Sequence, residues 1–167
     1  MHKLLIIGHG RHGKDTVAEI LHQKYGYSFT SSSEFVGRRA VWPQIQSDDE
    51  YIFDNPYERY GNFDECFADR VNYRKYWGDA ISAYNTPDKT RTASELFAAG
   101  FDMYVGIRRR DELEAVVAAE LFDHIIWVDR SELLPDEDSS SMELNRDDAT
   151  IFLDNNGSLH DLNIIIH

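Results

Sequence analysis

The segment LLIIGHGRHGKDTVAEIL, residues 4–21, constrains the fold more than any other part of the chain. It joins a continuous apolar run, typical of a buried parallel strand, to a glycine-rich loop and then to apolar residues at helical spacing. The loop fits the pattern G-x-x-x-x-G-K through Gly8, Gly13 and Lys14, with an additional Gly10. Glycines let successive backbone N–H groups point at phosphate oxygens, and the following helix adds its positive dipole end. The segment therefore predicts a phosphate-binding loop rather than a glycine-rich structural turn.

The residue after Lys14 departs from the usual form of such a loop. Asp15 stands where a Ser or Thr normally touches magnesium, and Thr16 follows it. Asp15 could bind Mg²⁺ as a hard oxygen ligand, or simply begin the helix, where negative charge is favoured. We predict ATP and Mg²⁺ as cofactors, with Asp15 and Thr16 near the metal. The loop residues predicted to hold the nucleotide are Gly8, Gly10, Arg11, His12, Gly13, Lys14, Asp15 and Thr16.

Composition and charge limit the class of protein and its partners. The chain has 167 residues, 42% of them hydrophobic and 28% charged, as expected for one globular domain over residues 1–167. No apolar run approaches the roughly 20 residues that a bilayer requires, and the N-terminus resembles no signal or transit peptide, so a cytoplasmic protein is predicted. The net charge of −13 disfavours long nucleic acid, whereas arginines gathered in a few segments favour a small anionic ligand, and a homodimer stays open. A single cysteine, Cys66, excludes an internal disulfide and a Cys-rich zinc site.

Apolar runs alternate with helical patterns along the chain, which predicts an α/β fold with three layers around a central, mostly parallel sheet. Strands are expected over 3–8, 101–107, 124–129 and 149–155, and a short one within YSFTSSSEF, residues 27–35, that closes with its serines. Helices are expected over 14–25, 34–42, 64–84, 89–99 and 108–122, with a short one at the C-terminus. The helix from residue 34 should stop near Trp42, because Pro43 disfavours helical geometry in the residue before it. The pattern leaves a helical insertion over about 34–100, a loop over 46–61 and a lid-like loop over about 130–148.

Four segments resemble the bacteriophage deoxynucleoside monophosphate kinases and the related animal-type phosphomevalonate kinases. The loop has the form GxxxxGKDT, MYVGIRRRDELEA resembles a strand that runs into an arginine and a helix, and IIWVDRS resembles the next strand, ahead of the lid. ATIFLDNNGSLHDL is similar to the closing segment of the phage enzymes. The resemblance covers the first 30 and last 70 residues. Gly106 takes the place of an aspartate suited to a Walker-B or base role, and the final helix is shortened.

The resemblance implies a P-loop kinase that moves the γ-phosphoryl group of ATP to a deoxynucleoside monophosphate, in the host cytoplasm if the protein is phage-encoded. It implies that Arg130 closes over the donor phosphates and that Asn155, Asn156 and Gly157 hold the adenine through backbone contacts. Other acceptors, such as a modified DNA base or a small phosphorylated metabolite, stay open. So do a nucleotide-binding module without catalysis and a host-interacting protein that merely keeps the fold.

Arginines and carboxylates outside the loop complete the predicted site, because phosphoryl transfer depends on charge neutralisation. Arg108 follows a buried strand, where a phosphate role competes with a surface ion pair, and Ser33 could bind substrate or cap a helix. Asp102, Asp129 and Asp69 are the carboxylate candidates. The predicted catalytic residues are Lys14, Arg108, Arg130 and Asp69, and the predicted substrate-binding residues are Ser33, Arg38, Arg70 and Arg74.

The predicted long helix carries two aromatic residues that could have either a binding or a core role. Asp69, Tyr73 and Trp77 recur at four-residue spacing and would share one helix face. The two rings could stack on an acceptor base or belong to the core. His9 and His12 flank the phosphate loop without a carboxylate cluster nearby, so no metal site is assigned to them.

Overall fold

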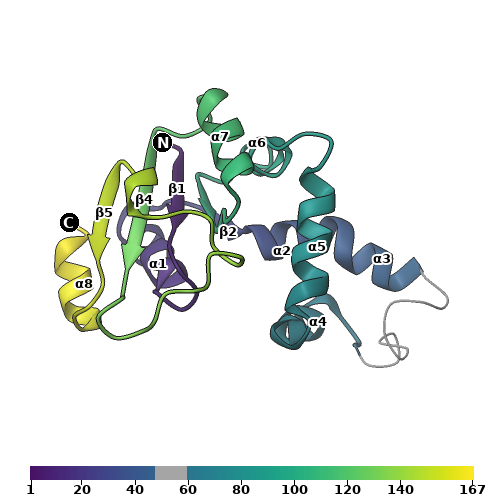
Figure 1. The fold of residues 1–167 in the computed structure, drawn as a ribbon, viewed down its shortest axis with the longest axis horizontal. Coiled ribbons are helices and arrows are strands. Elements are labelled where there is room, and N and C mark those ends of the chain that lie inside the picture. Colours follow the sequence, from purple (N-terminus) through teal and green to yellow (C-terminus); the bar gives the residue numbers. More distant parts are fainter. Residues whose placement is uncertain (48–59) are drawn as a thin grey trace.

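The computed structural model describes residues 1–47 and 60–167, and five strands in it form one sheet in the order β2-β3-β1-β4-β5 (Figure 1). The strands are β1 Leu4–Ile7, β2 Phe29–Ser31, β3 Met103–Val105, β4 His124–Asp129 and β5 Ile151–Asp154. All four pairings are parallel. The predicted α/β class with a central parallel sheet is therefore confirmed, with β1 in the middle.

Helices cover both faces of the sheet. They are α1 Lys14–Tyr25, α2 Ser32–Val36, α3 Trp42–Ser47, α4 Phe63–Asp69, α5 Arg74–Asn85, α6 Arg91–Ala98, α7 Arg110–Ala118 and α8 Leu159–Ile165. Leu5 and Ile7 of β1 belong to a core that includes α6 and α7, whereas Leu4 and Ile6 belong to a core that includes α1 and α8. Successive side chains of a strand point to opposite faces, so the continuous apolar run of β1 serves two cores at once.

A third core lies outside the sheet, among α3, α4 and α5, which group to one side of it in Figure 1. Trp77 of α5 is buried there at 5% exposure, together with Phe63 and Cys66 of α4. Burial raises the pKa of the Cys66 thiol to about 11, which suits an unreactive core residue. The core reading of Trp77 thus prevails over base stacking.

The chain stays helical past Trp42, so the predicted stop before Pro43 is wrong. A π-helical segment, Gly37–Val41, leads from α2 directly into α3. The amide of Trp42 donates to the carbonyl of Gly37, five residues back. This wider turn places Pro43 in the first turn of α3, where a missing N–H costs little. Of the loop predicted over 46–61, residues 46 and 47 belong to α3, and 48–59 lie outside the described residues.

The helix predicted over 64–84 is also interrupted. It consists of α4, a 3₁₀ turn over Arg70–Asn72, and α5, with Tyr73 at φ −123° and ψ 34° between them. Asp69, Tyr73 and Trp77 therefore do not share the face of one continuous helix. Among the described residues, no helix is both long and apolar enough to cross a membrane.

Candidate functional site

The loop between β1 and α1 has the backbone geometry of an anion-binding turn. Gly13, at the N-cap of α1, adopts φ +95°, and no side chain caps the helix. A Cβ atom on Gly13 would lie 2.3 Å from the Asn155 amide nitrogen, and the positive φ strains any other side chain, so this position favours glycine. Because the first N–H groups of α1 have no intrahelical partner, they are available to an anion in the loop.

Lys14 lies inside this loop and is close to a second cation. Its ammonium group donates to the carbonyls of Gly8, at 2.8 Å, and His9, at 2.6 Å. Burial, and then the positive charge of Arg108, lower the pKa of Lys14 to about 8, against the opposing effect of Asp15. A buried ammonium whose charged form is disfavoured, near a second cation, defines a site that an anion would stabilise.

Arg108 follows β3 and holds the segment 130–148 over the loop. Its guanidinium donates to Glu137, at 2.8 Å, and to the carbonyl of Ser141, at 3.3 Å. Arg110, two residues on, pairs with Asp148 further along the same segment. Both arginines thus anchor the segment, but Arg108 does so at the phosphate loop.

Arg130, His12 and Asn155 connect the start of this segment to the phosphate loop. The Arg130 amide donates to His12 Nδ1 at 3.1 Å, and its guanidinium donates to the Asn155 carbonyl at 2.8 Å. The Asn155 side chain donates to the His12 carbonyl at 2.8 Å. The turn expected to meet the adenine therefore abuts the loop, while Gly157, two residues on, is exposed.

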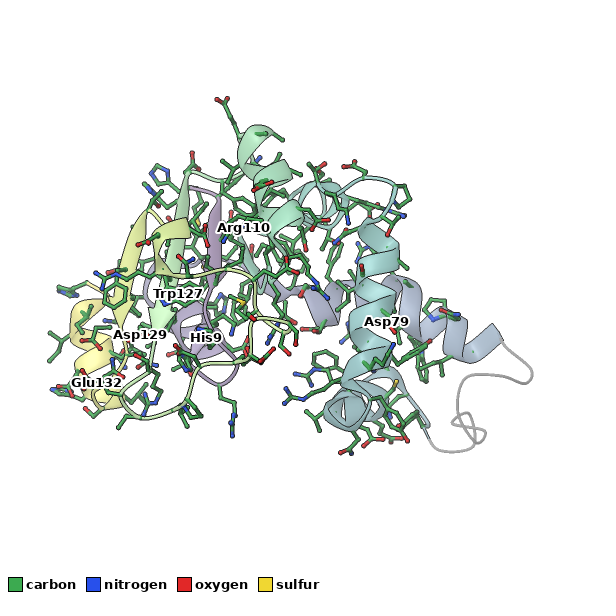
Figure 2. All side chains as sticks on the ribbon, in the orientation of Figure 1. His9, Asp79, Arg110, Trp127, Asp129 and Glu132 are labelled. Atoms are coloured by element: carbon green, nitrogen blue, oxygen red, sulfur yellow. The ribbon has the colours of Figure 1, made fainter. Side chains whose placement is uncertain are left out.

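His9 is the residue whose role sequence reasoning missed. It is buried at 9% exposure, its ring packs edge-on against Trp127, and its Nδ1 accepts from the Glu137 amide at 3.0 Å (Figure 2). Its Nε2 lies 3.5 Å from Asp136. Two histidines within a phosphate loop were visible in the sequence, but their partners come from a segment about 120 residues away.

The carboxylate candidates lie at opposite ends of the strands. Asp102 precedes β3 and accepts from the Ser28 amide at 3.0 Å, so it lies at the amino end of the strands, opposite the loop. Asp129 ends β4 at the loop's edge, where it accepts from Ser131 and Asn156. Topology thus rules out Asp102 as a ligand at this site, because the loop follows the carboxyl end of β1.

Arg70 and Arg38 of the helical region surround a pair of aromatic rings. Arg70 stacks on Phe67, 3.8 Å from the ring centre, and Arg38 lies 4.1 Å from the ring centre of Phe63. The two rings stack on each other. Arg38 also pairs with Glu34 of α2 at 3.2 Å.

The charges around Arg70 connect the helical region to the phosphate loop. Burial lowers its pKa, Asp15 and Glu34 oppose this, and the nearby Arg74 lowers it further. Arg70 is therefore within electrostatic reach of the first turn of α1.

The other predicted residues lie as follows. Arg11, Asp15, Thr16 and Arg74 are exposed, and Ser33 is half-buried in the first turn of α2. The serine that caps α2 is Ser31, whose hydroxyl accepts from the Glu34 amide. Asp69, in the last turn of α4, accepts from Tyr60 and Asn72.

Among known proteins, the chain has matches in solved structures but not in sequence. No protein-family model and no curated protein sequence matches the chain. Solved structures do match. A sugar kinase from Janibacter sp. HTCC2649 is 12% identical, with a TM-score of 0.49 over 99% of this chain and 91% of that chain. A gluconokinase from Sinorhizobium meliloti 1021 is 13% identical, with 0.45 over 99% and 89%. TT1252 from Thermus thermophilus is 21% identical, with 0.49 over 97% and 93%.

The strand order and the loop geometry, rather than these likenesses, define the fold. A parallel sheet with β1 between β3 and β4, and a G-x-x-x-x-G-K loop that leads into α1, form a three-layer α/β P-loop fold.

Proposed function

We propose that this protein is a Mg²⁺-dependent kinase that transfers the γ-phosphoryl group of ATP to a deoxynucleoside monophosphate. The observation that carries the proposal is a glycine-rich loop that leads into an uncapped helix and holds Lys14 within electrostatic reach of Arg108. Phosphoryl transfer asks a protein mainly to position two phosphates and to neutralise their charge, and this arrangement suits both tasks.

On the donor side, Lys14 and the loop amides would hold the β- and γ-phosphates, and the turn at Asn155–Gly157 would hold the adenine. Arg130, which already bridges the loop and this turn, would lie beside the phosphates. Asp15 and Thr16 are exposed in the first turn of α1, and their oxygens suit a hard cation. When bound there, Mg²⁺ would neutralise charge on the donor phosphates.

On the acceptor side, the arginines near the stacked aromatic rings support a nucleotide that carries its own phosphate. Arg38, Arg70 and Arg74 would bind the acceptor phosphate, with Ser33 in the first turn of α2, just after the second strand. Since the charges of Arg70 and Asp15 influence each other, an acceptor held by Arg70 would face the donor loop. Asp69, in the turn before Arg70, stays the predicted catalytic carboxylate in the absence of an aspartate at Gly106.

The proposal is tested by ADP release from ATP and Mg²⁺, measured with each common deoxynucleoside monophosphate and its ribose counterpart. We expect release that depends on one or a few deoxynucleotides and that stops when the metal is chelated. Release with a phosphorylated metabolite or a modified base instead would identify another acceptor. ATP binding without any acceptor-dependent release would identify a nucleotide-binding module.

Arg70 provides a prediction specific to the acceptor. In Arg70→Gln, the KM for the acceptor should rise by about 10- to 100-fold, the value of a lost charged hydrogen bond to phosphate, while the KM for ATP stays within about twofold. Steady-state kinetics with each substrate varied in turn measures this. Arg146→Gln is the matched control, since Arg146 stacks on Phe152 near the far edge of the sheet. An equal rise in both KM values for Arg70→Gln would contradict the assignment.

A further inference from the structure

The carboxylate of Glu137 lies inside the phosphate loop. One of its oxygens, Oε2, accepts from the Gly10 amide at 2.6 Å and from the Arg108 guanidinium at 2.8 Å. The side chain is only 20% exposed. Its other oxygen would lie 2.8 Å from a Cβ atom on residue 10, so the absence of a side chain at Gly10 admits the carboxylate to the loop.

The groups that hold this carboxylate are those that hold a phosphate oxygen in a P-loop. They are a backbone N–H of the glycine-rich turn and a guanidinium, with the ammonium of Lys14 near enough for its charge to act on Glu137. Burial alone would raise the pKa of Glu137. The hydrogen bond and the charge of Arg108 outweigh burial, so the pKa lies below its ordinary value. Glu137 is therefore a carboxylate anion in the position of a ligand.

Two imidazoles hold the surrounding segment, residues 130–137, against the loop. His12 Nδ1 accepts from the amide of Arg130, and His9 Nδ1 accepts from the amide of Glu137. Both rings are therefore protonated on Nε2 when neutral. The segment is attached to the loop at both ends, through Arg130 at the first residue and Glu137 at the last.

We propose that Glu137 is an internal anion that occupies the phosphate cradle of the empty protein and is exchanged for a phosphate group of the nucleotide. The exchange would free the Gly10 amide and Arg108 for the ligand and release Glu137 from the loop, while Arg130 stays beside the phosphates. This inference rests on the proposed function in one respect, namely that the loop binds a nucleotide phosphate.

The exchange predicts that Glu137 weakens nucleotide binding in the wild-type protein. When a side chain of the protein occupies a binding site for most of the time, the ligand can bind only the molecules whose site is vacant. The apparent affinity is then the intrinsic affinity multiplied by the vacant fraction. Glu137→Gln keeps the shape of the side chain and removes its charge. Glu132→Gln is the matched control, because Glu132 lies in the same segment, is exposed and carries the same charge (Figure 2).

The experiment is a calorimetric titration of the protein with ATP and Mg²⁺ without an acceptor. Glu137→Gln should bind ATP about 3- to 10-fold more tightly than the wild type, as expected for the loss of a partly exposed competing ion pair. Glu132→Gln should bind as the wild type does. Equal effects of the two variants would overturn the exchange, because they would reflect the change in net charge alone. Weaker binding by Glu137→Gln would overturn it too, because Glu137 would then support nucleotide binding.

Hydrogen exchange of the wild-type protein tests the same proposal without a variant. With ATP bound, the amide of Glu137 should exchange faster than in the empty protein, since its bond to His9 is released. Unchanged or greater protection of the Glu137 amide would refute the exchange. The two proposals fail differently. Absence of ATP binding by the wild type and both variants would overturn the nucleotide site itself, whereas Lys14-dependent binding without an effect of Glu137 would overturn the exchange alone.

Discussion

Replacing Lys14 with alanine is expected to lower kcat for phosphoryl transfer by about 100- to 1,000-fold, the usual cost of removing one charge-stabilising donor from such a site. The ammonium group is the positive centre of the loop, where it bonds the carbonyls of Gly8 and His9 and lies near Arg108. Steady-state kinetics measures the loss, and thermal unfolding checks that the loop and its helix remain folded. Activity within about tenfold of the wild type would exclude Lys14 from the transition state.

The pH dependence of ATP binding separates this role from a structural one. With its pKa lowered to about 8, Lys14 is charged below that pH in the empty protein and loses its proton above it. Bound phosphates favour the charged form, so affinity should be constant below pH 8 and fall by up to about tenfold per pH unit above it. Lys14→Arg, which stays charged, should lose this decline. If Lys14→Ala kept the same profile, another group would be responsible.

Substituting Glu112 with glutamine is expected to stabilise the protein by roughly 3 kcal/mol at pH 8 and to have little effect near pH 4.5. Glu112 of α7 is buried at 7% exposure, where it accepts from the Tyr104 hydroxyl at 3.1 Å and from Asn85 at 3.3 Å. Burial raises its pKa from 4.5 to about 7. A glutamine oxygen can accept the same two bonds without carrying a charge.

The sign follows from the protons bound in each state. Between pH 4.5 and 7 the folded protein keeps a proton on Glu112 that the unfolded chain releases, so the contribution of this group to stability falls as pH rises. Denaturant unfolding of wild type and Glu112→Gln at several pH values should therefore diverge through this window. Glu114→Gln, on the exposed side of α7, should follow the wild type. Parallel curves for all three proteins would show that Glu112 ionises normally.

The network around Glu112 also connects the sheet to the helical region. Asn85 of α5, which donates to Glu112, accepts from the amide and the hydroxyl of Thr92 on α6. Tyr104 belongs to β3, next to the central strand. The buried polar groups thus join three helices to the sheet.

Local sequence determined the part of the site built from neighbouring residues. The apolar run, the glycines and the helical spacing predicted β1, the loop and α1, and the helix bounds Lys14–Tyr25 are confirmed. The strand over 124–129 is likewise confirmed. These elements depend on backbone geometry and side-chain periodicity within a few residues, which the order of amino acids specifies directly.

Tertiary structure alone decided which distant residues meet this loop. The helical patterns at 34–42 and 64–84 predicted one helix each, but a π-helical turn carries the first past Pro43 and a 3₁₀ turn divides the second before Tyr73. Asp102 and Arg108 flank the same strand, so Asp102 lies at its amino end, away from the phosphate loop, and Arg108 lies beyond its carboxyl end. Glu137 reaches Gly10 across 127 residues of chain. Such pairings depend on strand order and on the path of a long segment across the sheet, and no local pattern records either of them.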